Sequence, residues 1–385
     1  MKRSKRHSPF VLYAAIVSLP LLLLSCSMME DDRSDCPDCR NTLRVMLRYD
    51  YNIQRANMFG DQVEEATVFV VDPVTGTVVD LQTMGSTTDV HPMSNPSFAF
   101  NFEGLAPGRY RLYATGRSAA DAAFSVTMPQ IAESIDRLQF TVPSTLQGNE
   151  SMVPAQRLDT LWNTLKPIDI TVPENQPAEA TVPLMRLTND LNIVIFRRDG
   201  SLDNSHNRYK VSVTDETLTL GYDNEPTADG LAQAQPLQYQ PFAAWTTETT
   251  ASDGSPVGTS SGSPNTTASD GSPVGTNSIV ERNAHYDLSL FRLLTHDDAR
   301  HNARLLITNS ETGHEIVNID LCYYLALARN AYETQHYSTQ EYLDREYDYR
   351  LDFGIAGQGS EETWKYMTIR INVLSWAIRI QNEEL

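Results

Sequence analysis

The chain has 385 residues, and its 49 acidic residues outnumber its 30 basic residues, which gives a net charge of −19. Nucleic-acid binding needs clustered Lys and Arg, and the longest basic cluster lies at the extreme N-terminus, so the composition argues against a nucleic-acid partner. At about 150 residues for each domain, the length predicts about two domains with substantial hydrophobic cores.

The N-terminus carries an export signal that ends in a lipidation motif. A basic stretch at residues 2–6 precedes an apolar run over residues 10–24, which Pro20 interrupts and which is too short to span a bilayer. Cys26 directly follows Leu-Leu-Ser, the arrangement at which bacteria attach lipid to exported proteins. We therefore expect residues 1–25 to be a lipoprotein signal peptide and Cys26 to be the lipid anchor that holds the protein on a membrane. A plain secretory signal is the alternative.

Residues 26–40 form an acidic tether that also contains two further cysteines, Cys36 and Cys39. Their spacing suits a redox pair or half a zinc site, but no second Cys pair or paired His completes a set of four ligands. A disulfide is the more natural fate in an exported protein, either between these two or from one of them to Cys322. We expect a structural role or none for these cysteines, and no metal.

Alternating apolar residues predict strands throughout the first half of the chain. Residues 65–71 and 77–81 flank a Pro/Gly turn, and a Gly-Pro turn near residue 106 separates another pair of strands. Residues 168–172 and 180–184 flank a Pro-Glu-Asn-Gln-Pro turn, which we interpret as a closing hairpin. The pattern predicts a first β-sandwich over residues 41–185, and its strand-turn-strand phrases resemble transthyretin-like sandwiches.

The second half repeats this pattern and adds helices. Strands are predicted near residues 191–195, 209–213, 304–307 and 316–319, followed by a helix over residues 321–331. A capping-box sequence, Ser-Thr-Gln-Glu at residues 338–341, predicts a short helix that runs to Arg345. We therefore expect a second β-sandwich over residues 186–385 with one or two short helices.

Two segments of the second half stand apart. Residues 246–278 contain almost no apolar side chain, and the sequence of residues 249–259 recurs at residues 266–276, which predicts an exposed low-complexity loop. The C-terminus returns to strand periodicity. The residues that we expect to form this structural C-terminal strand region are Ile369, Ile371, Trp376, Ile378 and Ile380.

No pattern in the sequence predicts catalysis or a cofactor. His296, Asp297, Asp298 and His301 offer metal-ligand chemistry, but we interpret them as a solvated loop because no helix or strand would place both histidines on one face. A nucleophile elbow, a phosphate loop and a calcium loop are all missing. We therefore expect a protein that is not an enzyme, without catalytic residues, metal or cofactor. Tyr and Trp residues could form a sugar platform, but most alternate within strands and suit a core.

Several short sequence segments resemble those of the FimB-type anchor subunits of type V pili, and they occur in the same order as in that family. The opening matches at residues 34–37, 43–52, Phe59 and 68–72, and the end matches at residues 341–349, 369–372 and 376–382. Weaker matches lie at residues 184–188 and 221–224. The similarity covers essentially the whole mature chain except the repeated loop.

The resemblance implies two tandem transthyretin-like β-sandwiches and a lipid anchor in the outer membrane. It also implies that the protein tethers a fimbrial shaft, limits its length, and contacts shaft subunits through β-strands. Shaft subunits in such systems lose their N-terminal segment to an arginine-specific protease, whereas an anchor is expected to keep it. The formal cleavage candidates here are Arg33, Arg40, Arg44 and Arg48. A surface glycan-binding β-sandwich lipoprotein is the alternative function.

Overall fold

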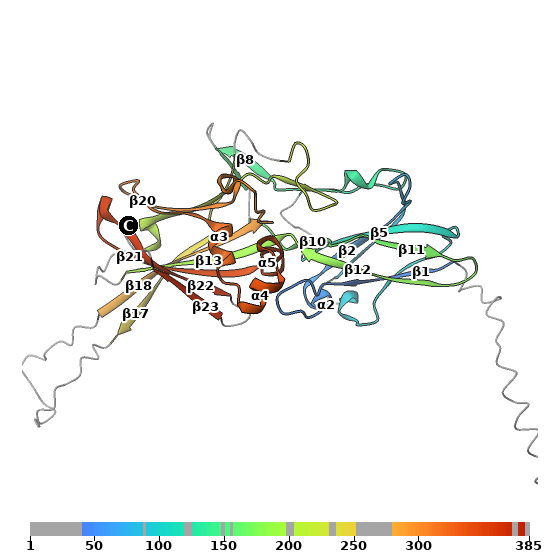
Figure 1. The fold of residues 1–385 in the computed structure, drawn as a ribbon, viewed down its shortest axis with the longest axis horizontal. Helices are drawn as coiled ribbons and strands as arrows, with labels where there is room; N and C mark the ends of the chain where they lie inside the picture. The colour runs from blue at the N-terminus through green and yellow to red at the C-terminus, as the bar shows by residue number, and fades with distance from the viewer. Residues whose placement is uncertain are drawn as a thin grey trace, which may run out of the picture.

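The protein is mainly β, and its strands form two bodies that lie end to end (Figure 1). The structure, a computed structural model, describes residues 41–87, 90–118, 125–147, 151–154, 157–197, 204–230, 236–251, 279–371 and 376–381. The first body contains the blue and green strands on the right of Figure 1, and the second contains most of the orange and red strands on the left. The predicted fold class, tandem β-sandwiches, is confirmed.

The first body is built on one eight-stranded path that folds into two layers. In hydrogen-bonded order the strands are β3 (Val78–Gly85), β2 (Glu65–Val71), β5 (Gly108–Arg117), β10 (Leu161–Thr164), β12 (Ala178–Arg186), β1 (Leu43–Arg48) and β4 (Phe100–Phe102), with β11 (Ile168–Val172) paired to β5. Only the β1–β12 pair among these is parallel. Inward side chains of β1, such as Leu43 and Val45, are completely buried in the core of this body.

The predicted hairpin between residues 168–172 and 180–184 is wrong. β11 pairs with β5, whereas β12 pairs with β1 through its first half and with β10 through its second half. The turn therefore carries the chain from one layer to the other. Period-two patterning reveals a strand and its buried face but not its partner, so a turn that crosses between layers has the same sequence signature as a hairpin turn.

A third layer covers the outer face of β2. It contains β6 (Ser125–Thr127), β7 (Gln139–Thr141) and β15 (Thr219–Gly221). Val68 and Val70 of β2 point into the first core, while Phe69 packs against the other core, which contains Phe140 of β7. Burial on both faces explains why β2 reads as an unbroken apolar run instead of an alternating one.

The second body is a sandwich of two six-stranded sheets. One sheet contains β17 (Ala243–Ala251), β18 (Ile279–Phe291), β13 (Thr188–Arg197), β21 (Asp348–Ala356), β22 (Thr363–Ile371) and β23 (Trp376–Gln381). The other contains β20 (Glu315–Asp320), β19 (Arg304–Asn309), β14 (Tyr209–Asp215), β16 (Leu237–Tyr239), β9 (Ser151–Pro154) and β8 (Ser144–Gln147). Their inward faces share one continuous core.

The chain does not divide between the two bodies at a single point. β12 ends at Arg186 and β13 starts at Thr188, close to the predicted boundary at residue 185. However, β7 pairs with β15, and β8 and β9 join the sheet of β14 and β16, although these strands precede the boundary in sequence. Figure 1 shows this segment running along the top of the molecule from the first body to β8.

The helices of the second body are more numerous than predicted. Instead of one helix over residues 321–331, the chain forms α3 (Leu321–Ala326) and then α4 (Ala331–His336). Asn330 separates them because its side chain accepts a hydrogen bond from the Glu333 amide and starts a new helix, while Glu333 completes the capping box. The predicted helix before residue 345 is confirmed as α5 (Thr339–Arg345), with Ser338 as its N-cap.

The remaining helices are short. The first body contains α2 (Phe59–Gln62), and the 3₁₀ turns are η3 (Pro92–Ser94), η4 (Ile135–Arg137), η5 (His206–Arg208), η6 (Ala299–His301) and η7 (Gly359–Glu361). Among helices in the described ranges, none combines the length and the apolar character that a membrane-spanning segment requires.

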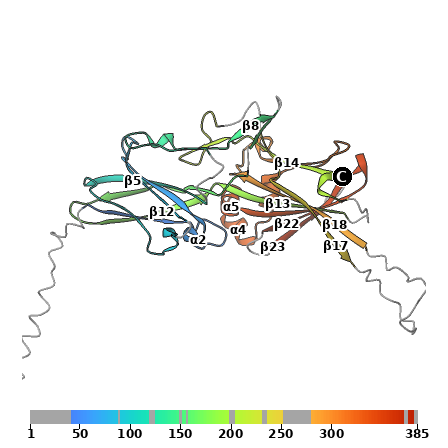
Figure 2. The same cartoon turned by 180° about the vertical axis from the view of Figure 1, so that it is seen from behind.

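The predicted loop over residues 246–278 begins later than expected. Residues 246–251 belong to β17, which pairs with β18 up to Ala251 and Ile279. Thr246, Thr247 and Glu248 are polar and at least partly exposed, which suits the arm of a two-stranded hairpin that needs no buried face along its whole length. Figure 2 shows this hairpin projecting from the second body. Residues 252–278, including the second copy of the repeat, lie outside the described residues.

Candidate functional site: the first strand and the domain junction

The first described strand, β1, lies inside its sheet and not at an edge. It pairs in parallel with β12 over its whole length, from Leu43 opposite Ala178 to Arg48 opposite Pro183. On its other side, Leu43 to Val45 pair with β4. Tension applied from the N-terminal side would therefore act along two hydrogen-bonded ladders and a buried apolar face at once.

Two of the candidate cleavage residues lie on the outward face of this strand. The Arg44 guanidinium donates to Glu179 Oε1 at 3.2 Å and to the Ser97 carbonyl at 2.9 Å. Arg48 forms an ion pair with Asp50 at 3.1 Å. Their peptide bonds lie in or directly after the β1–β12 ladder, where a protease would need the strand to leave the sheet. Arg33 and Arg40 lie outside the described residues.

A tight loop connects the end of β1 to the second body. The Asn52 side chain donates to the carbonyls of Tyr49 and Ala56 at 3.1 and 2.8 Å, which holds the loop closed. The Ile53 amide then donates to the Arg345 carbonyl at the end of α5, at 3.1 Å. The chain that leaves the first strand thus contacts the second body within a few residues.

Stacked arginine and tyrosine side chains extend this contact. The Arg345 guanidinium lies 4.0 Å from the ring centroid of Tyr51 and 4.6 Å from that of Tyr337. Arg55, from the same loop as Tyr51, lies 4.3 Å from the ring centroid of Tyr332 in α4. Guanidinium groups over aromatic faces are stabilised by cation–π attraction, typically about 0.5–1 kcal/mol at exposed sites.

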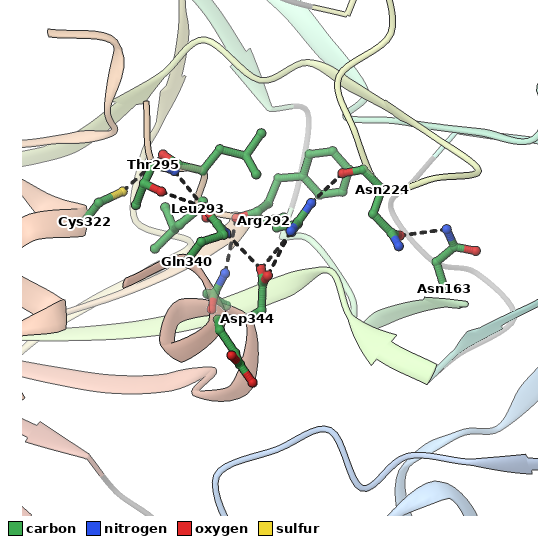
Figure 3. Close-up of polar contacts among 12 residues, drawn as sticks. Asn163, Asn224, Arg292, Leu293, Thr295, Cys322, Gln340 and Asp344 are labelled. Atoms are coloured by element: carbon green, nitrogen blue, oxygen red, sulfur yellow. Dashed lines mark hydrogen bonds and ion pairs between the residues drawn. The ribbon is translucent and has the colours of Figure 1, made fainter. Parts of the chain in front are cut away.

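A buried ion pair forms the centre of the junction (Figure 3). Arg292, directly after β18, donates through two nitrogens to the Asp344 carboxylate of α5 at 2.7 and 2.8 Å. The two side chains are 9% and 7% exposed. The same guanidinium donates to the Asn224 carbonyl. A bidentate pair of this kind fixes orientation as well as distance.

Asn224 carries the network into the first body. Its side-chain oxygen accepts from the Asn163 amide of β10 at 2.7 Å, and its own amide donates to the Thr164 carbonyl at 2.8 Å. Figure 3 shows Asn163, Asn224, Arg292 and Asp344 in one connected line. Asn163 is fully buried, so this chain of contacts is shielded from water. Its four members come from four widely separated parts of the sequence, and no local signal identifies them.

A buried carboxyl lies beside this network. Glu346, directly after α5, is completely buried, and one of its oxygens accepts from the amides of Tyr347 and Asp348 at 3.0 and 3.1 Å. Its other oxygen and the hydroxyls of Tyr342 and Tyr349 have no hydrogen-bond partner among the described residues. Burial raises the pKa of Glu346 to about 8, because the ionised form loses its hydration.

Of the four cysteines for which the sequence predicts a role, only Cys322 lies among the described residues. Cys26, Cys36 and Cys39 lie outside the described residues. Cys322, in α3, is completely buried, is not bonded to another described cysteine, and donates through its sulfur to the Leu294 carbonyl at 3.5 Å. Burial raises its thiol pKa to about 12, so the thiol is held protonated and unreactive. The disulfide pairing of the tether stays a prediction.

The C-terminal strand region lies at the edge of a sheet. Ile369 and Ile371, in β22, are 0% and 2% exposed. β23 pairs antiparallel with β22, which places Trp376 opposite Ile371 and Ile378 opposite Ile369. Ile380 stands opposite Met367 in the same register. The side chains of Trp376, Ile378 and Ile380 lie outside the described part of the structure, so their burial stays a prediction.

The two candidate metal-binding histidines lie closer together than the sequence indicated. The loop around η6 brings the rings of His296 and His301 to a centroid distance of 6.2 Å, edge to face. As predicted, no helix or strand places them on one face, and the loop itself brings the two rings near each other. His301 instead contacts Glu216 at 3.0 Å. Within the described residues, no group of three or more His, Cys, Asp or Glu side chains is placed to hold a metal ion.

Several aromatic side chains of the second body are exposed, although the sequence favours a core position for most Tyr and Trp residues. Trp245 is 38% exposed and stacks on His285 at 5.1 Å with nearly parallel rings. Tyr323 and Tyr332 are 57% and 46% exposed. They lie on β17, α3 and α4 respectively. Their positions gave no periodicity that separates them from buried aromatics.

Comparison with known proteins gives one family match and several related structures. The family model for fimbrillin-A associated anchor proteins Mfa1 and Mfa2 matches residues 33–382. No curated protein shows significant sequence similarity to the chain. Among solved structures, a candidate adhesin of Bacteroides thetaiotaomicron has a TM-score of 0.65 and 21% identity, covering 90% of this chain and all of that one.

Two further structures have the same architecture. A candidate polysaccharide-binding protein of Bacteroides thetaiotaomicron has a TM-score of 0.64 and 23% identity, covering 90% of this chain and 100% of that chain. The fimbrial anchor protein Mfa2 of Porphyromonas gingivalis has a TM-score of 0.54 and 14% identity, covering 88% and 99%. At these identities the likeness establishes a shared fold over nearly the whole length of each chain.

Proposed function

The chain belongs to the family of fimbrillin-A associated anchor proteins Mfa1 and Mfa2, and from this premise we propose that it is an outer-membrane lipoprotein that anchors a fimbria. Membership of the family implies association with fimbrial subunits and a place at the cell surface. In the proposed arrangement, lipid on Cys26 holds the chain in the outer membrane, residues 27–40 form the tether, and the folded domains hold the fimbria.

The observation that carries the proposal is the integration of β1 into its sheet. An anchor must keep the segment that joins it to the membrane, and β1 is held by β12 along its whole length and by β4 over half of it. Leu43, Val45 and Leu47 add a buried apolar face to this attachment. Removal of β1 would expose the first core to water. The folded state that keeps β1 is therefore also the more stable one.

The domain junction supports the proposal from a second direction. An anchor transmits tension between the membrane and the fimbria, which would separate two loosely joined domains first. Here the Ile53–Arg345 hydrogen bond, the Asn163–Asn224–Arg292 contacts and the crossing strands β7 to β9 join the two bodies, and the Arg292–Asp344 pair holds α5 to the end of β18. Tension that enters through β1 is therefore distributed over a continuous structure.

Contact with shaft subunits is proposed to use sheet edges. β17 and β20 each have one strand partner in the described structure and thus present backbone donors and acceptors on the other side. A partner strand can complete such an edge, with alternate side chains setting the register. A subunit that keeps its own first strand and binds the shaft in this way would also end assembly, which would limit fimbrial length.

The test is the substitution Cys26→Ala in the bacterium that carries the chain. We expect the protein to leave the detergent phase and the membrane fraction, and fimbriae to appear in the culture medium. Cys322→Ala is the matched control, since Cys322 is buried in α3 and should not affect either measurement. Unchanged detergent partitioning of Cys26→Ala would contradict lipid anchoring. Retained fimbriae after loss of the protein would contradict the anchor function.

We also propose that the chain is not an enzyme, on the basis of its sequence, which lacks the motifs of nucleophile, phosphate and calcium sites. The buried carboxyl of Glu346 and the buried thiol of Cys322 are placed inside the core, where a substrate has no access. Assay of the purified protein on glycan and peptide substrates would contradict this proposal if turnover were found and persisted after repurification.

The exposed aromatic residues favour a second candidate function, the binding of surface glycans. Trp245 presents a ring stacked on His285, and flat aromatic rings of this kind are suited to packing against sugar rings. Retention of the protein on a polysaccharide column, reduced by Trp245→Ala and unaffected by Trp364→Phe in the core, would support it. Passage through a panel of host and bacterial polysaccharides without delay would exclude it.

A further inference from the structure

β14 has a stretch of unpaired backbone in the middle of its sheet. On one side, Tyr209 to Thr214 pair continuously with β19. On the other side, only Val213 to Asp215 pair with β16. The described part of the chain therefore provides no strand next to residues 209–212 on that side.

The direction of the backbone groups follows from the register. The Ser310 amide donates to the Arg208 carbonyl, so even-numbered residues of β14 exchange hydrogen bonds with β19. In an antiparallel pair the intervening residues direct their backbone groups to the opposite side. Tyr209 and Val211 thus direct an amide and a carbonyl each toward the open side, where both residues line the groove described below, although the two residues as a whole are only 3% and 5% exposed respectively.

Pro241 is the reason for the gap. Continuing the register beyond Tyr239 opposite Val213 would place Gln240 opposite Ser212 and Pro241 opposite Val211. Proline has no amide hydrogen to donate and is excluded from the middle of a ladder. The chain instead leaves the sheet here and enters β17 of the facing sheet, where Ala243 pairs with Asp287.

The gap opens into a groove of about 610 Å³. Its walls are the unpaired stretch of β14 and the connection from β16 to β17, with Tyr286 of β18 and Leu306 of β19 completing it. Lys210 and Ser212 stand on the β14 wall. A smaller cavity of about 210 Å³ shares Gln240 and Pro241 with the groove and is lined by Arg157.

The charge of this groove is opposite to that of the chain as a whole. The groove and the adjoining cavity include no Asp or Glu among their lining residues, in a chain with 49 acidic residues. Lys210 lines the groove and Arg157 lines the adjoining cavity, so both contribute positive charge, although Arg157 also lies 4.0 Å from Asp190. The groove therefore suits an extended segment that carries acidic side chains.

We propose that this groove binds one extended segment of a fimbrial subunit, which adds as a strand to Tyr209–Ser212 and places an acidic side chain beside Lys210. The backbone of the segment would complete the hydrogen bonds of Tyr209 and Val211, and Pro241 keeps the position vacant in the free protein. The inference rests on the proposed anchor function and assigns its strand contact to a particular site.

The experiment uses the full-length chain on fimbriated cells, with the photoreactive amino acid benzoylphenylalanine at Ser212. After irradiation, the tagged chain is purified and cross-linked peptides are identified by mass spectrometry. We expect a cross-link to one segment of a fimbrial subunit. The control carries the same probe at Lys166, an exposed position between β10 and β11 of the first body, and should not give that cross-link.

Charge variants test the same site independently of the bulky probe. Lys210→Glu should reduce the amount of fimbrial subunit that co-purifies with the chain by about two- to fivefold, the range of a partly exposed ion pair. Lys166→Glu should leave it unchanged. Lys210 is exposed, and equal thermal unfolding of the two variants would show that the fold is not the cause.

The outcomes separate the site from the function. Fimbrial subunits that co-purify with the chain while the Ser212 probe links to nothing, to this chain itself, to a second copy or to a polysaccharide would overturn the groove assignment and leave the anchor function standing. Failure of fimbrial subunits to co-purify with the unmodified chain would overturn both. A cross-link from Ser212 that Lys210→Glu does not weaken would overturn the acidic character assigned to the segment.

Discussion

Glu346 is the residue whose chemistry depends most on its surroundings. It is completely buried near the hydroxyls of Tyr342 and Tyr349, and the acidic residues Asp348 and Glu333 interact with it electrostatically. Burial is the largest cause of its raised pKa of about 8, and these two carboxylates add to it, against the lowering effect of its two backbone hydrogen bonds. At neutral pH the carboxyl is therefore protonated in the folded protein and ionised in the unfolded chain.

This difference predicts a pH-dependent stability. Between pH of about 4.5 and 8, unfolding releases the proton of Glu346, so the free energy of unfolding falls as pH rises, by at most about 1.4 kcal/mol per pH unit. Glu346→Gln keeps the acceptor oxygen and cannot ionise, so it should flatten this slope and be more stable than the parent at pH 8. Urea unfolding at pH 5 to 8 measures it, with exposed Glu174→Gln as control. An unchanged slope would contradict the assignment.

Because the Arg292–Asp344 ion pair at the junction is buried, its loss should lower the free energy of unfolding far more than the loss of an exposed ion pair. Arg292→Ala leaves the Asp344 carboxylate without its partner in a buried site and should cost about 3–5 kcal/mol in the free energy of unfolding. Arg300→Ala is the matched control, because Arg300 and its partner Asp298 are 87% and 43% exposed, and it should change stability by less than about 0.5 kcal/mol. Urea unfolding compares them. Equal effects would show that the junction is hydrated.

At the scale of elements, the β17–β18 hairpin predicts tolerance to changes in its loop. Ala251 and Ile279 pair with each other, so the ends of the repeated segment are already held together. Loop closure changes by only about 0.6 kcal/mol for each doubling of loop length. Deletion of residues 266–276 should therefore leave the melting temperature almost unchanged. A sharply lowered melting temperature would show that the second copy of the repeat contributes to the core.

For the last strand, β23, we expect the opposite, namely that a single substitution lowers the stability of the protein strongly. β23 pairs residue by residue with β22, whose Ile369 and Ile371 are buried, and a slip of one residue would reverse the faces of the strand. Trp376→Ala should cost about 3–5 kcal/mol if its ring is packed as we predict. Tyr323→Ala, at an exposed aromatic, is the control. Rapid proteolytic trimming of residues 367–382 while the rest stays folded would instead favour a free donor strand.

At the scale of the whole molecule, the crossing strands predict that the two bodies unfold together. A fragment of residues 188–385 lacks β7, β8 and β9, which leaves β15 without its partner β7 and leaves β16 paired only with β14. A fragment of residues 41–187 would in turn expose Phe140 and Val142, which are buried by the other body. We expect neither fragment to fold alone, and their mixture to recover structure.

The full chain should accordingly show one unfolding transition. Tryptophan fluorescence and far-ultraviolet circular dichroism should follow the same urea curve, because β7 and β9 belong to the first half of the chain but pair with strands of the second half. Two separated transitions, or a well-dispersed NMR spectrum from residues 188–385 alone, would contradict a single cooperative unit. Either result would show that the two bodies fold as independent domains.

Features that depend only on neighbouring residues are predictable from the amino-acid sequence. Period-two alternation located β13, β14 and β19 because the pleat of a strand depends only on adjacent residues. Ser338 predicted the start of α5 because an N-cap acts within one turn. The order of short phrases along the chain indicated the fimbrial anchor family, which the family match over residues 33–382 confirmed.

Only the tertiary structure decided which segments meet. The parallel pairing of β1 with β12, the passage of β7 to β9 into the second body, and the alignment of Asn163, Asn224, Arg292 and Asp344 all join residues more than 50 positions apart. Alternation shows that a strand has a buried face but does not specify its partner. The groove beside β14 has the same origin, since Pro241 produces it only because the register with β16 places that residue opposite Val211.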